Sequence, residues 1–132
     1  MYNFQMGISM LPDADSMKCY AVGDIKVQRV SHYGGRCEEN VFLPAGHSHD
    51  GVFHARSDEE LYVIRGTGTF TCGGESRYYS PGTTIQVPRG VQHGFSARTE
   101  TVLFSLQEPP IVDLETGDAD IHYHEVRLQA QE

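Results

Sequence analysis

Histidines and carboxylates gather in one short segment of the chain, just before an apolar run, and another histidine follows further along. They are His47, His49, His54, Glu59 and Glu60 in LPAGHSHDGVFHARSDEELYVIRG (43–66), and His93 in VPRGVQHGF (87–95). Neutral imidazoles and a carboxylate are ligands of intermediate hardness that suit Fe, Mn, Ni, Co or Zn. The residue types therefore predict a site for one divalent transition metal.

The spacing of the later histidine resembles the second of two motifs that mark the cupin superfamily, whose members are small β-barrels with a ligand or metal site in the mouth. That motif is a Gly, five residues, Pro-x-Gly, two residues and a His. It is met by Gly82, Pro88, Gly90 and His93, whereas the Asn expected four positions after the His is Ala97. The resemblance implies an all-β fold, an antiparallel double-sheet β-barrel of the cupin or jelly-roll type.

The earlier segment resembles the first motif, which runs Gly, five residues, His-x-His, three or four residues, Glu, six residues and Gly. Laid on the sequence without a gap, the motif falls on Gly46, Val52, His54, Glu59 and Gly66. Every spacing holds, and Val52 stands where the first of the paired histidines is expected. A gapped alternative assigns His47 and His49 to the pair and requires a loop over 50–58. The ungapped register is favoured, and the gapped one stays open.

In the ungapped register, the resemblance implies that His54, Glu59 and His93 bind the metal, with His49 as an added fourth ligand. Strand alternation places Glu59 on the same face as Leu61 and Val63, toward the interior. Alternation from His54 puts His49 on the wrong face, but a β-bulge between 49 and 52 near Gly51 would bring it back.

Other residues of the same segments have candidate roles in the site. His54 and Glu59 are also candidate catalytic residues that move protons, and Phe95 and Phe104 are expected to line the barrel as substrate-binding residues if alternation holds. The histidines outside the two motifs are interpreted as surface or hydrogen-bonded residues; they are His32, His122 and His124.

Short β-rich runs separated by Gly and Pro turn signals must position these side chains. They are 25–33, 36–44, 60–66, 67–72, 83–88, 93–97 and 101–107. This pattern predicts a single domain over 1–132, with a barrel core at about 25–108 and irregular ends at 1–18 and 109–132. The segments DIKVQRV and DIHYHEVRL have no obvious partner inside a compact barrel, which favours pairing with a second subunit in a homodimer.

Composition limits the partners and the location. A net charge of -8 without a basic run disfavours nucleic acid and anionic membranes, since both require a positive face. Cys19, Cys37 and Cys72 form no CxxC pair, which favours reduced thiols. No signal peptide or membrane span is recognisable at the start, so we expect a cytoplasmic protein.

The function expected from the residues and the resemblance is that of a small metal-binding enzyme acting on a small oxygenated organic substrate. Lewis-acid and acid–base chemistry at such a site would serve a cyclase, an isomerase or a dioxygenase. The alternative is a non-catalytic, small-molecule-binding or regulatory cupin that has lost its metal.

Overall fold

The computed structural model describes residues 7–14 and 17–123, and within these ranges every regular element is a β-strand. The strands are β1 Ile8–Ala14, β2 Met17–Val22, β3 Ile25–Tyr33, β4 Arg36–Leu43, β5 Ser48–Phe53, β6 Asp58–Arg65, β7 Gly68–Cys72, β8 Glu75–Tyr79, β9 Thr84–Val87, β10 His93–Ala97, β11 Thr101–Glu108 and β12 His122–Tyr123. In the described part of the chain, no helix has the length and hydropathy needed to span a membrane.

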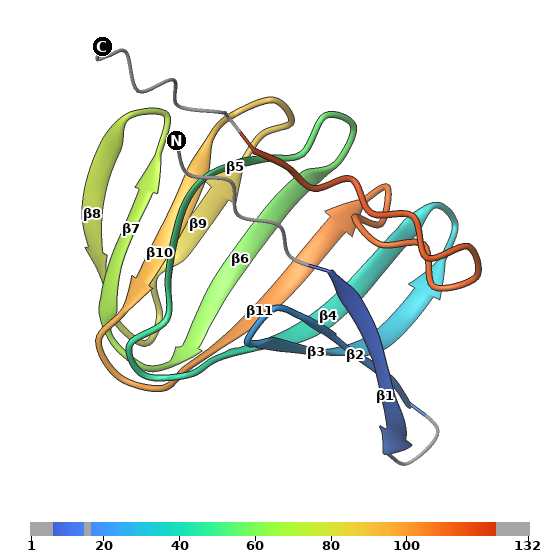
Figure 1. The fold of residues 1–132 in the computed structure, drawn as a ribbon. Coiled ribbons are helices and arrows are strands. Elements are labelled where there is room, and N and C mark those ends of the chain that lie inside the picture. Colours follow the sequence, from blue (N-terminus) through green and yellow to red (C-terminus); the bar gives the residue numbers. More distant parts are fainter. Residues whose placement is uncertain (1–6, 15–16, 124–132) are drawn as a thin grey trace, which may run out of the picture.

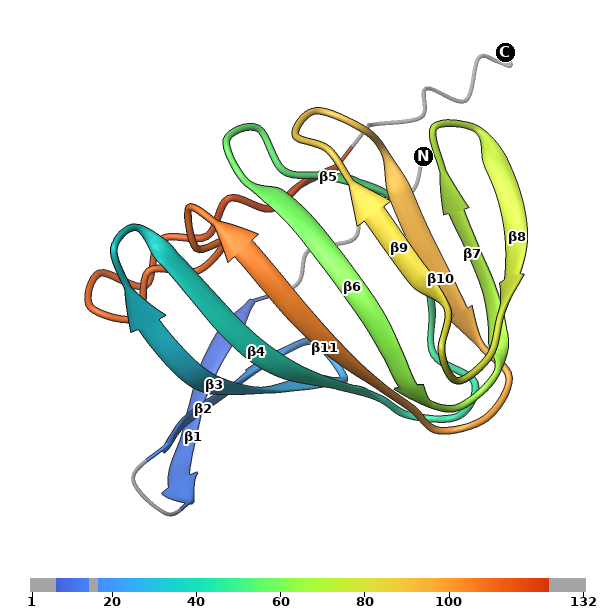
Figure 2. The ribbon, with the colours of Figure 1, turned by 180° about the vertical axis from the view of Figure 1, so that it is seen from behind.

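The strands form two antiparallel sheets that face each other (Figure 1). The larger sheet has the order β1-β2-β3-β4-β11-β6-β9, and the smaller one has the order β12-β5-β10-β7-β8. Seen from behind, the larger sheet curves around one side of the molecule (Figure 2). The predicted double-sheet, jelly-roll fold is therefore confirmed, as two sheets that are not hydrogen-bonded into one closed barrel.

Alternating side chains of the two sheets build the core between them. Leu61 and Val63 on β6, Leu103 on β11, and Phe70 and Phe95 on the smaller sheet all belong to this buried cluster. Tight turns connect the neighbouring strands, and Gly73 and Gly74 adopt positive φ between β7 and β8, a conformation that glycine reaches without steric cost. The predicted runs correspond to β3, β4, β6, β7, β9, β10 and β11, while β1, β2, β5, β8 and β12 were not predicted.

The expectation of irregular ends is corrected by the structure. β1 and β2 extend the larger sheet next to β3, and β12 pairs with β5. After β11, the chain crosses from the side of β3 and β4 to β5, as the red segment of Figure 1 shows. DIKVQRV lies in β3 apart from its first residue, Asp24, and the first residues of DIHYHEVRL pair within the same chain. The argument that these segments need a second subunit is therefore wrong, and the homodimer stays a prediction.

Candidate metal centre

Two strands and a loop bring one group of potential metal ligands together. His54 follows β5, Glu59 lies near the start of β6, and His93 begins β10. Each offers one ligand atom, and these atoms all lie within 4.8 Å of one another. His54 Nε2 and Glu59 Oε1 are 3.5 Å apart, and the rings of His54 and His93 have centroids 4.9 Å apart. This is the set of residues that the ungapped motif indicated.

The β-bulge anticipated near Gly51 is present in β5. In the pairing with β10, His93 lies opposite Val52, but Phe95 lies opposite His49. Two residues of β10 thus match three of β5, and Gly51 takes a positive φ of 75° in the extra position. His49, Val52 and His54 consequently share the interior side of the strand.

His54 is oriented by a backbone carbonyl of the C-terminal segment. Its Nδ1 lies 2.8 Å from the carbonyl oxygen of Asp120. A carbonyl only accepts, so Nδ1 must carry a proton and donate it. In the neutral ring this leaves the Nε2 lone pair directed toward Glu59. Hydrogen bonding of the remote ring nitrogen is the usual way in which proteins fix the tautomer of a metal-binding histidine.

Hydrogen bonds orient His93 and Glu59 in the same way. His93 Nδ1 donates to the carbonyl oxygen of Val91 over 3.1 Å, so its Nε2 is also the unprotonated nitrogen in the neutral ring. Ser105 Oγ donates to Glu59 Oε2 over 2.6 Å and leaves Oε1 for the histidine side. Two imidazole lone pairs and one carboxylate oxygen therefore converge, and this donor set fits a divalent transition metal.

A buried polar chain supports Glu59 from behind. Gln107 donates through Nε2 to Ser105 Oγ and to Glu39 Oε1, at 2.9 and 2.7 Å. Glu39 Oε2 in turn accepts from the Tyr20 hydroxyl at 2.7 Å and from Arg29 Nε at 2.8 Å. Buried polar groups are costly unless they are satisfied, so this chain fixes Ser105 and, through it, Glu59.

Burial and mutual charge set the protonation of the group. Burial favours a lower pKa of His54, but the hydrogen bond and negative charge of Glu59 outweigh it and raise this pKa. Burial favours a higher pKa of Glu59, and the contact with His54 outweighs it in the opposite direction. For His93, burial and the charge of His54 together lower the pKa. The contact between His54 and Glu59 thus favours the charged form of each partner.

The ligand group lies in a cavity of about 110 Å³ between the two sheets. His49, His54, Glu59 and His93 line it, together with mainly apolar side chains and the polar residues Tyr20, Glu39 and Gln107. Phe95 is among the apolar lining residues, as the sequence indicated.

The placement of Phe104 in the cavity is wrong. On β11 the inward, buried residues are Leu103, Ser105 and Gln107, so Phe104 lies on the outer face, opposite Asn40 and Tyr62 of the neighbouring strands. The wrong face of this strand was expected to point inward, because two of its inward residues, Ser105 and Gln107, are polar. Their inward position reflects the buried polar chain that reaches Glu59.

His49 does not join the group of ligand atoms formed by His54, Glu59 and His93. Its Nδ1 lies 2.6 Å from His47 Nε2, and His47 Nδ1 lies 2.6 Å from Asp24 Oδ1. His47 is buried as well. We therefore do not count His49 among the ligands.

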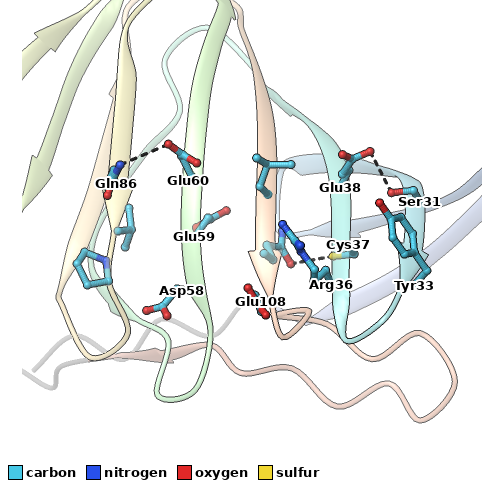
Figure 3. Close-up of a pocket in the computed structure, with 14 residues that line it drawn as sticks. Ser31, Tyr33, Arg36, Cys37, Glu38, Asp58, Glu59, Glu60, Gln86 and Glu108 are labelled. Carbon is cyan, nitrogen blue, oxygen red and sulfur yellow. Dashed lines mark hydrogen bonds between the residues drawn. The ribbon is translucent and has the colours of Figure 1, made fainter.

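A second, larger depression of about 380 Å³ lies at one end of the larger sheet (Figure 3). Its labelled side chains include Glu38, Glu60, Asp58 and Glu108, with Arg36 among them. It contains none of the histidines of the ligand group. Glu59 lines this depression too, but His54 and His93 do not, so of the two cavities only the smaller one holds all three potential ligand residues.

Asp120 is the residue of the site that sequence reasoning missed most clearly. Its buried carboxylate accepts hydrogen bonds from the backbone N–H groups of Ala55, Arg56 and Ser57, over 2.8, 2.8 and 3.1 Å. Burial favours a higher pKa of Asp120, but these N–H donors and His122 outweigh it and lower the pKa to about 2. Asp120 thus holds both the loop after His54 and, through its carbonyl, the ring of His54. No motif marks it, because the contact spans about half the chain.

Of the remaining histidines, His32 and His122 do not line the cavity. His122 lies 2.9 Å from Asp120 Oδ1 and stacks on Phe53, with ring centroids 5.2 Å apart. His32 is exposed on β3, and His124 lies outside the described residues. The cysteines Cys19, Cys37 and Cys72 are all free thiols.

Comparison with known proteins agrees with this architecture. The family model described as "Cupin domain" matches residues 40–106. No curated protein matches the chain significantly. Among solved structures, KdgF from Halomonas sp. is 26% identical with a TM-score of 0.61, and the match covers 66% of this chain and 80% of that one.

More distant structures share the fold. The ectoine synthase from P. lautus is 18% identical, with a TM-score of 0.66 and coverage of 83% of this chain and 82% of its own. The nucleoside dehydratase Pac13 is 16% identical, with a TM-score of 0.65 and coverage of 93% and 92%. The match to the family model spans half of the chain and contains His54, Glu59 and His93. The chain therefore belongs to the cupin family.

Proposed function

We propose that this protein is a metal-dependent cupin enzyme that acts on a small oxygenated organic substrate. The observation that carries the proposal is that hydrogen bonds orient His54, Glu59 and His93 so that their free donor atoms meet. Both rings donate Nδ1–H to backbone carbonyls, and Glu59 is held by Ser105, so the three free donor atoms converge in one cavity. Such preparation serves metal binding, whereas a packing role for these side chains would not require it.

The residues of the chain divide the work in the proposed reaction. His54, Glu59 and His93 hold the ion, which would supply Lewis-acid polarisation of a carbonyl or enolate oxygen. A set of two histidines and one carboxylate leaves coordination positions open for a substrate or water. Phe95 and the apolar lining exclude water from the substrate, and a histidine outside the ligand set moves protons.

The reaction type remains among cyclase, isomerase, dehydratase and dioxygenase chemistry. The neighbours named ectoine synthase and nucleoside dehydratase support an enzymatic use of this fold, at identities that indicate the fold alone. In a metal-free variant of the same proposal, His54 and Glu59 act as acid and base, since they already form a close pair in the cavity. We propose a cytoplasmic location for the protein.

The test is metal analysis of untagged protein purified without chelator, by inductively coupled plasma mass spectrometry. We expect about one equivalent of a transition metal in the wild type and its loss in His54→Ala, because a true ligand cannot be replaced by the remaining groups. His32→Ala, on the exposed surface of β3, is the matched control and should retain the metal. Wild-type protein that neither contains metal nor takes up Zn²⁺, Fe²⁺, Mn²⁺, Ni²⁺ or Co²⁺ would overturn the metal-dependent proposal and leave the metal-free acid–base variant and the non-catalytic binding cupin.

A homodimer belongs to the same proposal. Phe42 on β4 and Ile64 on β6 are exposed on the outer face of the larger sheet, and Phe104 lies on β11 between these strands. Exposed apolar side chains that gather on one sheet face are typical of association surfaces. The outer face of the larger sheet is thus the proposed contact between two copies.

A further inference from the structure

Three titratable side chains form a continuous line from the surface to the cavity. The carboxylate of Asp24 is about half exposed, and its Oδ1 lies 2.6 Å from Nδ1 of the buried His47. His47 Nε2 lies 2.6 Å from His49 Nδ1, with ring centroids 4.8 Å apart. His49 lines the same cavity as the proposed metal ligands. Its Nε2 has no hydrogen-bonding partner within residues 7–14 and 17–123.

The hydrogen bonds fix one set of tautomers when Asp24 is ionised and both rings are neutral. The carboxylate can only accept, so His47 must donate through Nδ1 and carry its lone pair on Nε2. His49 must then donate through Nδ1, which leaves the lone pair of His49 on Nε2. The last nitrogen of the line is therefore an unprotonated base at the cavity.

From this geometry we propose that Asp24, His47 and His49 form a proton relay between solvent and the cavity, in which His49 Nε2 exchanges a proton with the bound substrate. The inference rests on the proposed function for the presence of a substrate. It gives His49, which the motif comparison treated as a ligand, a catalytic role of its own.

Each proton moves one step along hydrogen bonds that are already present. His49 Nε2 accepts a proton from the substrate, and the proton on His49 Nδ1 passes to His47 Nε2. The proton on His47 Nδ1 then passes to the Asp24 carboxylate, from which water removes it. The reverse sequence returns a proton to the substrate and restores the first tautomers. The relay therefore suits reactions that remove and return a proton, such as an isomerisation or an elimination that releases water.

The surroundings of His49 keep its ring neutral. Burial first, and then the proximity of His47 and His93, lower the pKa of His49 to about 3, against the opposing effect of Asp50 and Asp24. A histidine with so low a pKa holds a proton only briefly. A partner that can remove the charge at once is therefore an advantage, and His47 with Asp24 provides it.

Nuclear magnetic resonance of ¹⁵N-histidine-labelled, metal-free, full-length protein tests the relay without any substrate. At neutral pH we expect pyrrole-type resonances for Nδ1 of His47 and His49, and a pyridine-type resonance for His49 Nε2. Exchange of the His49 Nδ1 proton with water should slow by about 100-fold in Asp24→Asn, the low end of what a positioned acid–base group contributes. An amide in either orientation cannot take up the proton.

Asp50→Asn is the matched control, because it removes the same charge from another exposed residue whose charge acts on His49. It should leave the exchange rate near that of the wild type. A proton on Nε2 of wild-type His49 would overturn the proposal, as would equal exchange rates in Asp24→Asn and the wild type, or equal slowing in both variants. The measurement uses metal-free protein, so failure of the metal proposal would leave this test unaffected.

Discussion

Replacing Asp120 by Asn tests whether the C-terminal segment supports the metal centre. The carboxylate accepts from Arg56 N and Ser57 N through Oδ2, and from Ala55 N through Oδ1, with His122 on the same oxygen. An amide keeps only one accepting oxygen. In its better orientation it retains the two contacts at Arg56 and Ser57 and turns its NH₂ toward Ala55 N.

Two physical effects set the loss of stability in Asp120→Asn. Leaving the partly buried Ala55 N–H without its acceptor costs at most about 1–3 kcal/mol. Independently, the pKa of Asp120 falls from 3.8 to about 2 on folding, which corresponds to roughly 2 kcal/mol of stability at neutral pH. Because the folded-state pKa is the lower one, this stabilisation is complete above about pH 4 and is lost as the pH falls from 4 toward 2. We therefore expect Asp120→Asn to lower the free energy of unfolding by about 2 kcal/mol at pH 7 and by much less near pH 2.

Urea unfolding followed by circular dichroism at pH 7, 4 and 2.5 measures this difference. Asp113→Asn is the matched control: Asp113 lies in the same segment but is exposed and caps only its own turn at Glu115 and Thr116. Metal affinity of Asp120→Asn should also fall, by about 10–100-fold, because the loop next to His54 loses its anchor. A variant as stable as the wild type, or a deficit that does not shrink in acid, would refute the assigned role of Asp120.

Three further predictions follow from the site and the sheets. Ser105→Ala should weaken metal binding by about tenfold by freeing Glu59, whereas Ser76→Ala on the exposed part of β8 should not; competition with a chromogenic chelator measures both. Gly94→Ala should cost about 3 kcal/mol or prevent folding, because a Cβ there would overlap the backbone of His49 and Asp50, and Gly7→Ala, in open space, is its control in urea unfolding. Light scattering should give about twice the monomer mass of 14.7 kDa, and a monomer at high micromolar concentration would contradict the homodimer.

Most of the sheet framework could be predicted because glycine turns and short β-rich runs are local signals. The ligand set could be predicted too, since His54, Glu59 and His93 lie on spacings that the fold imposes. β8 was missed because its segment ESRYY is exposed at four of five positions, so it lacks the alternation that marks a half-buried strand.

The support of the site could not be predicted, because it depends on contacts between distant segments. Asp120 lies 66 residues from His54, and nothing in its sequence neighbourhood indicates a buried carboxylate. Strand alternation alone does not say which face of a strand is inward, and on β11 Ser105 and Gln107 hold the inward positions through partners on other strands. Burial of polar residues is decided by such partners, which become visible only in three dimensions.

The bulge in β5 keeps both halves of the histidine segment on one interior face. Without the extra residue, the strand would read His-Ser-His-Asp-Val-Phe-His, with His47, His49, Val52 and His54 alternating onto one face. The bulge absorbs the extra residue and preserves that face. Removal of one residue here would alter every motif spacing that crosses this point and leave the set of inward side chains unchanged. The set of inward side chains along β5 is thus fixed by its pairing with β10, and counting residues along the chain does not reveal it.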